Sequence, residues 1–382
     1  MSTPVFDAIL LTSFGGPESQ DEVVPFLERV TAGRGIPAER LLEVGQHYVK
    51  LGGVSPINAQ NRALLAALRQ HLPTRGIDLP IFWGNRNSAP YFADVLREIH
   101  AAGHRRVLAF VTSAYSSYSG CRQYRENLAA ALAETGLQDE LEIVKIRQYF
   151  DLPGFQEPMA EDLAAALRAS DSATEATSIL FTTHSIPTSM AGTSGPAESH
   201  ELNAAVEGTY TAQHLETAAS IMAVVADKLG TDPDRLPKWE LVYQSRSGSP
   251  SIPWLEPDIN DVISSKADAG VESILVVPIG FISDHVEVVW DLDTQAAETA
   301  AQHGLNYYRV RTAGVAPEFV SGIAGLIAEK LGGSSAGAGG AGVGGAGAGG
   351  AGAGAGANSG FCSTTCCLNQ RANLPVISGP SA

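Results

Sequence analysis

Positive charge is scarce in this sequence. Its 382 residues carry 25 Lys+Arg against 41 Asp+Glu, so the formal net charge is −16. A general nucleic-acid-binding protein needs a basic surface that neutralises phosphates, and anionic membrane surfaces attract basic segments. The charge balance therefore excludes nucleic acid as a partner and disfavours an anionic membrane surface.

Long apolar runs are missing as well. No stretch of about 18 or more strongly apolar residues is available to span a bilayer, and residues 1–7 lack the basic and apolar regions of a secretory signal. We therefore expect no transmembrane segment and a soluble, cytoplasmic protein. The 4 cysteines are too few for a secreted disulfide scaffold, and three of them, Cys362, Cys366 and Cys367, cluster far from Cys121.

Nucleotide-binding motifs are also absent. The glycine-rich segment FGGPE at 14–18 does not fit G-x-G-x-x-G, and no P-loop is present, so we expect no nucleotide cofactor. What the sequence does contain is a 44% share of hydrophobic residues, enough for a sizeable core.

Short apolar runs alternate with amphipathic helical patterns, which is typical of βαβ units and a parallel sheet. We predict an α/β fold with two Rossmann-like, doubly wound domains, each built on a four-stranded parallel sheet. The predicted strands cover 6–12, 81–84, 107–112, 141–146, 178–183, 240–244, 273–278 and 306–310. The clearest helical patterns cover 61–71, 93–102, 122–135 and 216–229.

The domain boundary is predicted where proline and glycine interrupt the pattern. We expect a first domain over 1–150 and a second over 151–315, followed by a closing helix over 316–331 that packs back on the first domain. The residues 332–359 are almost entirely Gly and Ala and are typical of a flexible linker. The cysteine-bearing tail at 360–382 ends the chain.

Ligands of open parallel sheets bind beyond the carboxyl ends of the strands. His184 follows one predicted strand there, and the segment ISDHVE leads from another into a helix. Asp284, Glu287 and Asp291 would share one helical face without a basic partner, which suits a divalent cation such as Fe(II). Two purely structural interpretations stay open. Asp284 and Glu287 could form a capping box at the start of the helix. His184 could be a strand-end histidine that is hydrogen-bonded only to the backbone.

The same segments carry a family resemblance. The segments are LTSFGGPE at 11–18, GGVSPIN at 52–58, WGNRN at 83–87, TSAYSSY at 112–118, FTTHSIP at 181–187, YQSRSGSPSIPWLEP at 243–257 and PIGFISDHVEVVWDLD at 278–293. Taken in order over residues 5–331, they resemble ferrochelatases, most of all the actinobacterial enzymes that insert Fe(II) into coproporphyrin III.

The resemblance implies a lyase that forms Fe-coproporphyrin III in haem biosynthesis. His184 matches the family's cleft histidine, and Glu287 matches its partner carboxylate. The resemblance implies that both are catalytic residues that handle the Fe(II) substrate. Asp291 is then expected to pass iron or protons to or from this pair. The alternatives are a protoporphyrin IX ferrochelatase and a non-catalytic tetrapyrrole or haem carrier on the same scaffold. The implied partners are the porphyrin, Fe(II) and downstream enzymes of the haem pathway.

Porphyrin contacts follow from the same resemblance. Ser55 and Tyr124 match positions that contact the porphyrin, Phe14 would supply apolar surface, and Arg34 and Lys50 border the cleft and suit carboxylates. Many members carry a tyrosine where this chain has Phe14, and a benzyl ring offers no oxygen to ligate iron.

The resemblance also accounts for the cysteines. Several ferrochelatases hold a [2Fe–2S] cluster with one internal and three C-terminal cysteines, which match Cys121 and Cys362, Cys366 and Cys367. Four thiolates are the number that such a cluster requires. Free thiols and a tetrahedral zinc site remain the alternatives.

Overall fold

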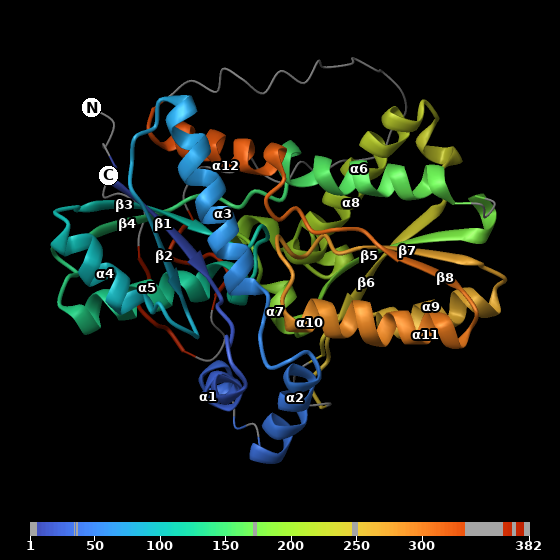
Figure 1. Cartoon of the computed structure of the whole chain (residues 1–382), viewed down its shortest axis with the longest axis horizontal. Coiled ribbons are helices and arrows are strands. Elements are labelled where there is room, and N and C mark those ends of the chain that lie inside the picture. Colours follow the sequence, from blue (N-terminus) through green and yellow to red (C-terminus); the bar gives the residue numbers. More distant parts are fainter. Residues whose placement is uncertain are drawn as a thin grey trace.

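The computed structural model describes residues 6–33, 35, 37–170, 174–246, 251–332, 362–368 and 372–377. Two four-stranded parallel sheets organise these residues, with the strand orders β2-β1-β3-β4 and β6-β5-β7-β8 (Figure 1). The strands are β1 (Ala8–Ser13), β2 (Ile81–Asn85), β3 (Arg106–Val111), β4 (Glu142–Lys145), β5 (Thr177–His184), β6 (Lys238–Gln244), β7 (Ser273–Val277) and β8 (Asn306–Arg309). The predicted fold class is confirmed, and every strand end lies within two residues of its prediction.

Helices connect the strands and cover both faces of each sheet. They are α1 (Gln20–Thr31), α2 (Ala38–Lys50), α3 (Ile57–His71), α4 (Phe92–Ala101), α5 (Gln123–Thr135), α6 (Pro153–Ala169), α7 (Thr188–Gly192), α8 (Thr209–Leu229), α9 (Ile259–Asp268), α10 (Val286–Val288), α11 (Ala297–Gln302) and α12 (Pro317–Lys330). Two π-helical segments, Tyr118–Arg122 and Val289–Ala296, precede α5 and follow α10. Within the described residues, no helix is both long and apolar enough to cross a membrane.

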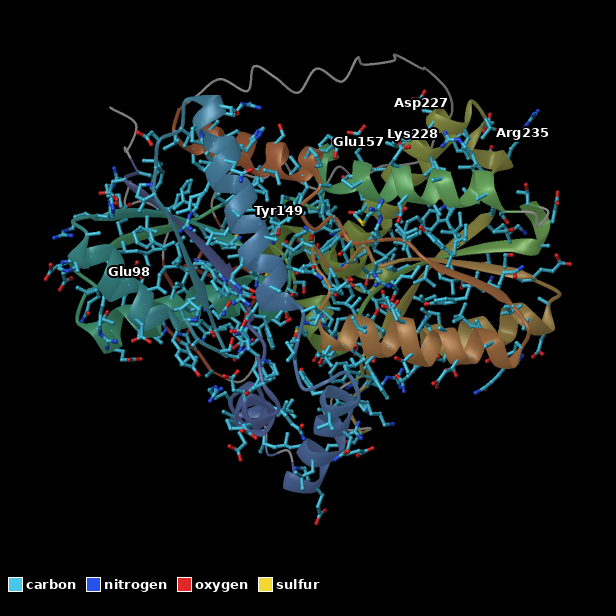
Figure 2. The ribbon with its side chains drawn as sticks, viewed as in Figure 1. Glu98, Tyr149, Glu157, Asp227, Lys228 and Arg235 are labelled. Carbon is cyan, nitrogen blue, oxygen red and sulfur yellow. The ribbon has the colours of Figure 1, made fainter. Side chains whose placement is uncertain are left out.

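The strands distribute their side chains alternately to two cores, as a pleated strand requires. In β1, Ala8 and Leu10 pack in the core beside α4 and α5, whereas Ile9 and Leu11 face the core beneath α3. The second core continues without interruption into the other sheet, beneath α6, α8 and α12. Tyr149 is fully buried in it, and Figure 2 shows this residue near the middle of the molecule. The two sheets therefore share one core on this side.

Helix α12 contacts both α3 and α6; Figure 1 shows it on the side of the first sheet, with one end next to α6. Pro153 occupies the first turn of α6, where its missing N–H has no helical partner to lose. A Cβ atom on Gly154 would lie 2.3 Å from the carbonyl oxygen of Glu318, so glycine permits the close contact between α6 and α12. The proline and glycine at the predicted boundary thus serve helix packing.

Candidate functional site

His184 is the last residue of β5, at the carboxyl end of the second sheet. The main chain around it is held firmly: the Ser185 N–H donates to the Gln244 carbonyl (2.7 Å) and the Tyr210 hydroxyl to the His184 carbonyl (2.9 Å). The imidazole Nδ1 donates to the Ser185 carbonyl. Because Nδ1 then carries the ring proton, Nε2 is left as a basic nitrogen. The side chain is 28% exposed, so this nitrogen is accessible.

Glu287 faces that nitrogen from α10. Its Oε2 lies 3.7 Å from the His184 Nε2, and its side chain is 44% exposed. Asp291 follows on the Val289–Ala296 π-helix and accepts hydrogen bonds from the Ser245 hydroxyl and the Gln244 amide (3.3 Å). Burial, with the charge of Glu287 adding to it, raises the pKa of Asp291 from 3.8 to about 6. The structure therefore brings together one imidazole and two carboxylates, one of which titrates near neutral pH.

Asp284 takes neither of its two predicted roles, as a helix cap or as part of an unpaired acidic stripe. The helix begins one residue later, with His285 as its N-cap, so Asp284 and Glu287 form no capping box. Both Asp284 carboxylate oxygens accept from Arg309 at 3.2 and 3.1 Å, and the Asp284 N–H donates to the Gln60 side chain. Arg309 ends β8, 25 residues later in the chain, so helical spacing cannot reveal it. Only Glu287 and Asp291 remain of the predicted acidic stripe.

Helices α1 and α2 form an arm that packs against α10 and the segment after it; Figure 1 shows the two helices below the two sheets. Val286 of α10 packs among the apolar side chains of the arm, beside Tyr48. Burial and the Glu287 charge raise the pKa of Tyr48, which keeps its hydroxyl neutral. Trp290 lies between the stacked His47 ring (4.3 Å between centroids) and the Lys50 ammonium, 5.0 Å from the indole. Lys50 therefore contacts an aromatic ring here.

A second group of predicted residues lies in the first half of the chain. The Arg86 guanidinium is 4.9 Å from the Phe14 ring centroid and 5.1 Å from that of Tyr124. Tyr124 is 4% exposed and so lies beneath this cation. Arg86 was missed by the sequence predictions, although it directly follows β2 at the carboxyl end of the sheet, where ligands bind.

Ser55 is 3% exposed, and its N–H donates to the Pro17 carbonyl at 2.9 Å. A Cβ atom on Gly16 would lie 2.6 Å from that of Ser55, so the glycine allows the loop after β1 to lie on this serine. The structure thus places Ser55 in the support of the loop that carries Phe14. Arg34, the remaining predicted contact, lies outside the described residues.

A cavity of about 290 Å³ lies elsewhere, between Leu72 and the start of β2. Ligands of parallel sheets bind at the opposite, carboxyl edge of the strands. We therefore do not assign this cavity to the site of His184 and Glu287.

The four cysteines meet in one buried cluster. Cys121 and Cys362 have their sulfurs 3.7 Å apart, and those of Cys366 and Cys367 are 3.6 Å apart. The Gly195 N–H donates to the Cys367 sulfur at 3.2 Å, and the Cys367 N–H donates to the Gly195 carbonyl at 3.1 Å. The three C-terminal cysteines thus reach Cys121 and also the segment that follows α7.

Two buried arginines of the first half hold the tail in place. The Arg122 guanidinium donates to the Thr364 carbonyl at 2.6 Å. Arg125 donates to the carbonyls of Ser363 (2.9 Å) and Ile377 (3.1 and 3.2 Å). The tail is therefore anchored by charged hydrogen bonds as well as by its cysteines.

In the described part of the chain, no group of three or more His, Cys, Asp or Glu side chains is arranged like the ligands of a bound metal ion. The four thiols instead touch one another as free cysteines. Their chemistry nevertheless suits a metal centre, because two thiolates on one tetrahedral ion lie about 3.8 Å apart. Hydrogen bonds from Cys121 and Cys366 lower the pKa of the Cys362 thiol, and the Lys145 charge acts in the same direction. The donors fit a [2Fe–2S] cluster or one zinc ion.

Comparisons with known proteins bear on this arrangement. A sequence model named Ferrochelatase matches residues 6–331. A coproporphyrin III ferrochelatase of Streptomyces coelicolor is 50% identical over 379 residues, which are 98% of this chain and 96% of the relative. One of Propionibacterium freudenreichii is 47% identical over 99% of this chain and 98% of the relative.

A solved structure, SirB from Bacillus subtilis with Fe3+, superposes with a TM-score of 0.50 over 85% of this chain and 95% of that chain. At 9% identity it shows that the fold is shared. With the family model matching nearly the whole body of the chain and close relatives matching it throughout, this protein belongs to the ferrochelatase family.

Proposed function

We propose that this protein inserts Fe(II) into coproporphyrin III and releases Fe-coproporphyrin III. The observation that carries the proposal is the facing pair of His184 and Glu287, 3.7 Å apart at the carboxyl end of β5. Relatives of about half-identical sequence carry the name coproporphyrin III ferrochelatase, which supports this porphyrin as the substrate.

Metal insertion must remove two pyrrole protons while Fe(II) exchanges its water for ring nitrogens. The His184 Nε2 is the ring nitrogen without a proton and is the atom that accepts one of them. Glu287 accepts the second proton or holds the incoming Fe(II), and in so close a pair the two roles are shared. Proton removal and metal delivery thus occur at one place.

Asp291 carries protons or iron to and from that pair. With a pKa of about 6 it exists in both protonation states around neutral pH. A group that exchanges protons readily at the working pH is suited to a relay. Asp291 therefore serves as the relay residue that exchanges protons or iron with Glu287.

The porphyrin contacts come from the first half of the chain. Phe14 supplies an apolar ring surface, and Arg86 between Phe14 and Tyr124 offers a cation for a propionate. Ser55, which supports the loop that carries Phe14, and Arg34 complete the set that we assign to substrate binding. Accordingly, residues 1–150 form the porphyrin-binding domain and residues 151–315 the domain that handles metal and protons.

Cys121, Cys362, Cys366 and Cys367 hold one [2Fe–2S] cluster in this proposal. The support is the buried four-thiol set and the anchoring of the tail around it. When bound, such a cluster supplies a one-electron centre and a covalent connection between tail and body. We place the reaction in the cytoplasm, where cysteines stay reduced and are available to ligate a metal centre.

The chelatase proposal is tested by anaerobic Fe(II) insertion, with coproporphyrin III and protoporphyrin IX measured side by side. The His184→Ala variant should lose more than about tenfold in rate, which is about 1.4 kcal/mol of barrier. His100→Ala is the matched control, because His100 pairs with Glu140 away from β5. Full activity of His184→Ala would refute the catalytic assignment, porphyrin binding without insertion would indicate a carrier, and equal kcat/KM would refute the substrate preference.

The cluster is tested by metal and acid-labile sulfide analysis of anaerobically purified protein. Two irons and two sulfides per chain are expected, and Cys366→Ser should remove the visible cluster absorption. One zinc and no sulfide would refute the cluster and leave the chelatase proposal intact.

A further inference from the structure

Gln148 is a buried polar side chain beside the four thiols that the proposed reaction does not use. It is 3% exposed, and its Oε1 accepts from the Cys362 thiol (3.6 Å) and from the Lys145 ammonium (3.3 Å). Its Nε2 has no hydrogen-bond partner among the described residues. A buried N–H₂ group without an acceptor destabilises the folded protein, so its presence needs an explanation.

Metal ligation of Cys362 would supply the missing acceptor. A cysteine ligates as the thiolate, so the S–H donor that now faces Oε1 disappears and the sulfur becomes an acceptor. Rotation of the carboxamide by half a turn exchanges its oxygen and nitrogen and directs the N–H₂ group at the sulfur. The same side chain therefore suits the thiol through its oxygen and the thiolate through its nitrogen.

Lys145 reinforces this preference. Its ammonium donates to the Ile146 carbonyl at 2.8 Å, which fixes it next to Gln148. The same ammonium lies 3.3 Å from the Gln148 Oε1, so its positive charge is close to the Cys362 sulfur that this oxygen contacts. An amide donor and a cation then act on the same ligand.

We propose that Gln148 is a hydrogen-bond donor to the Cys362 sulfur in the cluster-bound protein and that, together with Lys145, it raises the reduction potential of the cluster. The inference rests on the proposed [2Fe–2S] cluster. Hydrogen bonds to the sulfurs and nearby net charge are known determinants of such potentials. One-electron reduction converts one Fe(III) to Fe(II) and breaks no bond, so the added negative charge must be stabilised by these surroundings.

The test compares Gln148→Leu with Gln148→Glu and with Gln156→Leu as the matched control. Gln156 is a buried glutamine of α6 whose amide donates to the Phe150 carbonyl at 2.8 Å and which makes no hydrogen bond to a cysteine within the described residues. Each full-length protein is purified anaerobically and analysed for iron and sulfide. It is then titrated with dithionite and mediators, followed by visible absorption and by the paramagnetic signal of the reduced cluster.

Gln148→Leu should keep two irons and two sulfides, yet be about tenfold less reduced at a fixed potential, a shift of about 59 mV to more negative values for one electron. Gln148→Glu should shift at least as far in the same direction, because a carboxylate lacks the donor and adds negative charge. Gln156→Leu should not shift. An unchanged potential in both Gln148 variants would overturn the inference while the cluster stands. Wild-type protein without sulfide would overturn the cluster and the inference together.

Discussion

Replacing Asp291 by asparagine should make the protein more stable and less active. Its pKa is raised from 3.8 to about 6, a shift of about 2 units at about 1.4 kcal/mol per unit. Between these values the folded protein binds a proton that the unfolded chain lacks, so this group's contribution to stability falls as the pH rises from about 4 to 6. Because Asp291 is only partly buried, we expect Asp291→Asn to gain about 1–3 kcal/mol at pH 7.5 and nothing near pH 4.

The assay is urea unfolding of both proteins at pH 4.5, 6 and 7.5 in a metal chelator, alongside Fe(II) insertion at pH 7.5. Insertion should fall about tenfold, a loss of about 1.4 kcal/mol. Asp293→Asn is the control: this carboxylate, on the same π-helix, pairs with Arg309 at 2.5 and 2.9 Å, so removing it should not stabilise the protein. A gain in stability that is the same at every pH, or no gain at pH 7.5, would refute the reasoning about Asp291.

Three further predictions concern other parts of the molecule. Arg86→Ala should raise KM for coproporphyrin III about tenfold, since a hydrogen bond to a charged group contributes about 1.5–3 kcal/mol; an unchanged KM would refute propionate binding. Burial lowers the pKa of the fully buried His214 from 6.5 to about 3, so stability is lost as the pH falls below 6.5. Unfolding titrations of His214→Phe should therefore show a slope near pH 5 that is shallower by about 1.4 kcal/mol per pH unit, and an equal slope would contradict this. Gly195→Ala should release the tail to limited proteolysis, because a Cβ atom there would lie 2.7 Å from Thr209 and the residue has a φ of +81°; wild-type protease resistance would show that the loop accommodates it.

The strands were predictable because their signal is local. Each is a short apolar run, and the alternation in β1 between Ala8 and Leu10 on one face and Ile9 and Leu11 on the other is visible in the sequence. The start of α8 was not predictable in this way. Its first turns bury Gln213 and His214, polar residues that only tertiary contacts accommodate, so the amphipathic pattern appears seven residues late.

The same contrast between local sequence signals and tertiary contacts applies to the residues of the site. His184 and Glu287 could be located because one ends a strand and the other lies after a strand at the carboxyl edge of the second sheet, and the structure places them face to face. Arg309 could not, because its contact with Asp284 joins a strand end to a loop that is distant in the chain. Arg86 belongs to a segment that was recognised, but its position between Phe14 and Tyr124 depends on three separate elements coming together.

The order of synthesis determines when the four cysteines can meet. Cys121 precedes Cys362 by 241 residues, and ribosomes add about 5–20 residues per second. Cys121 therefore waits about 12–50 s for its partners, and the whole second sheet, with His184 and Glu287, is synthesised during this interval. Every nascent chain passes through a stage in which His184 and Glu287 have been synthesised and three of the four cysteines have not, so the cysteine cluster can form only after both sheets have been made.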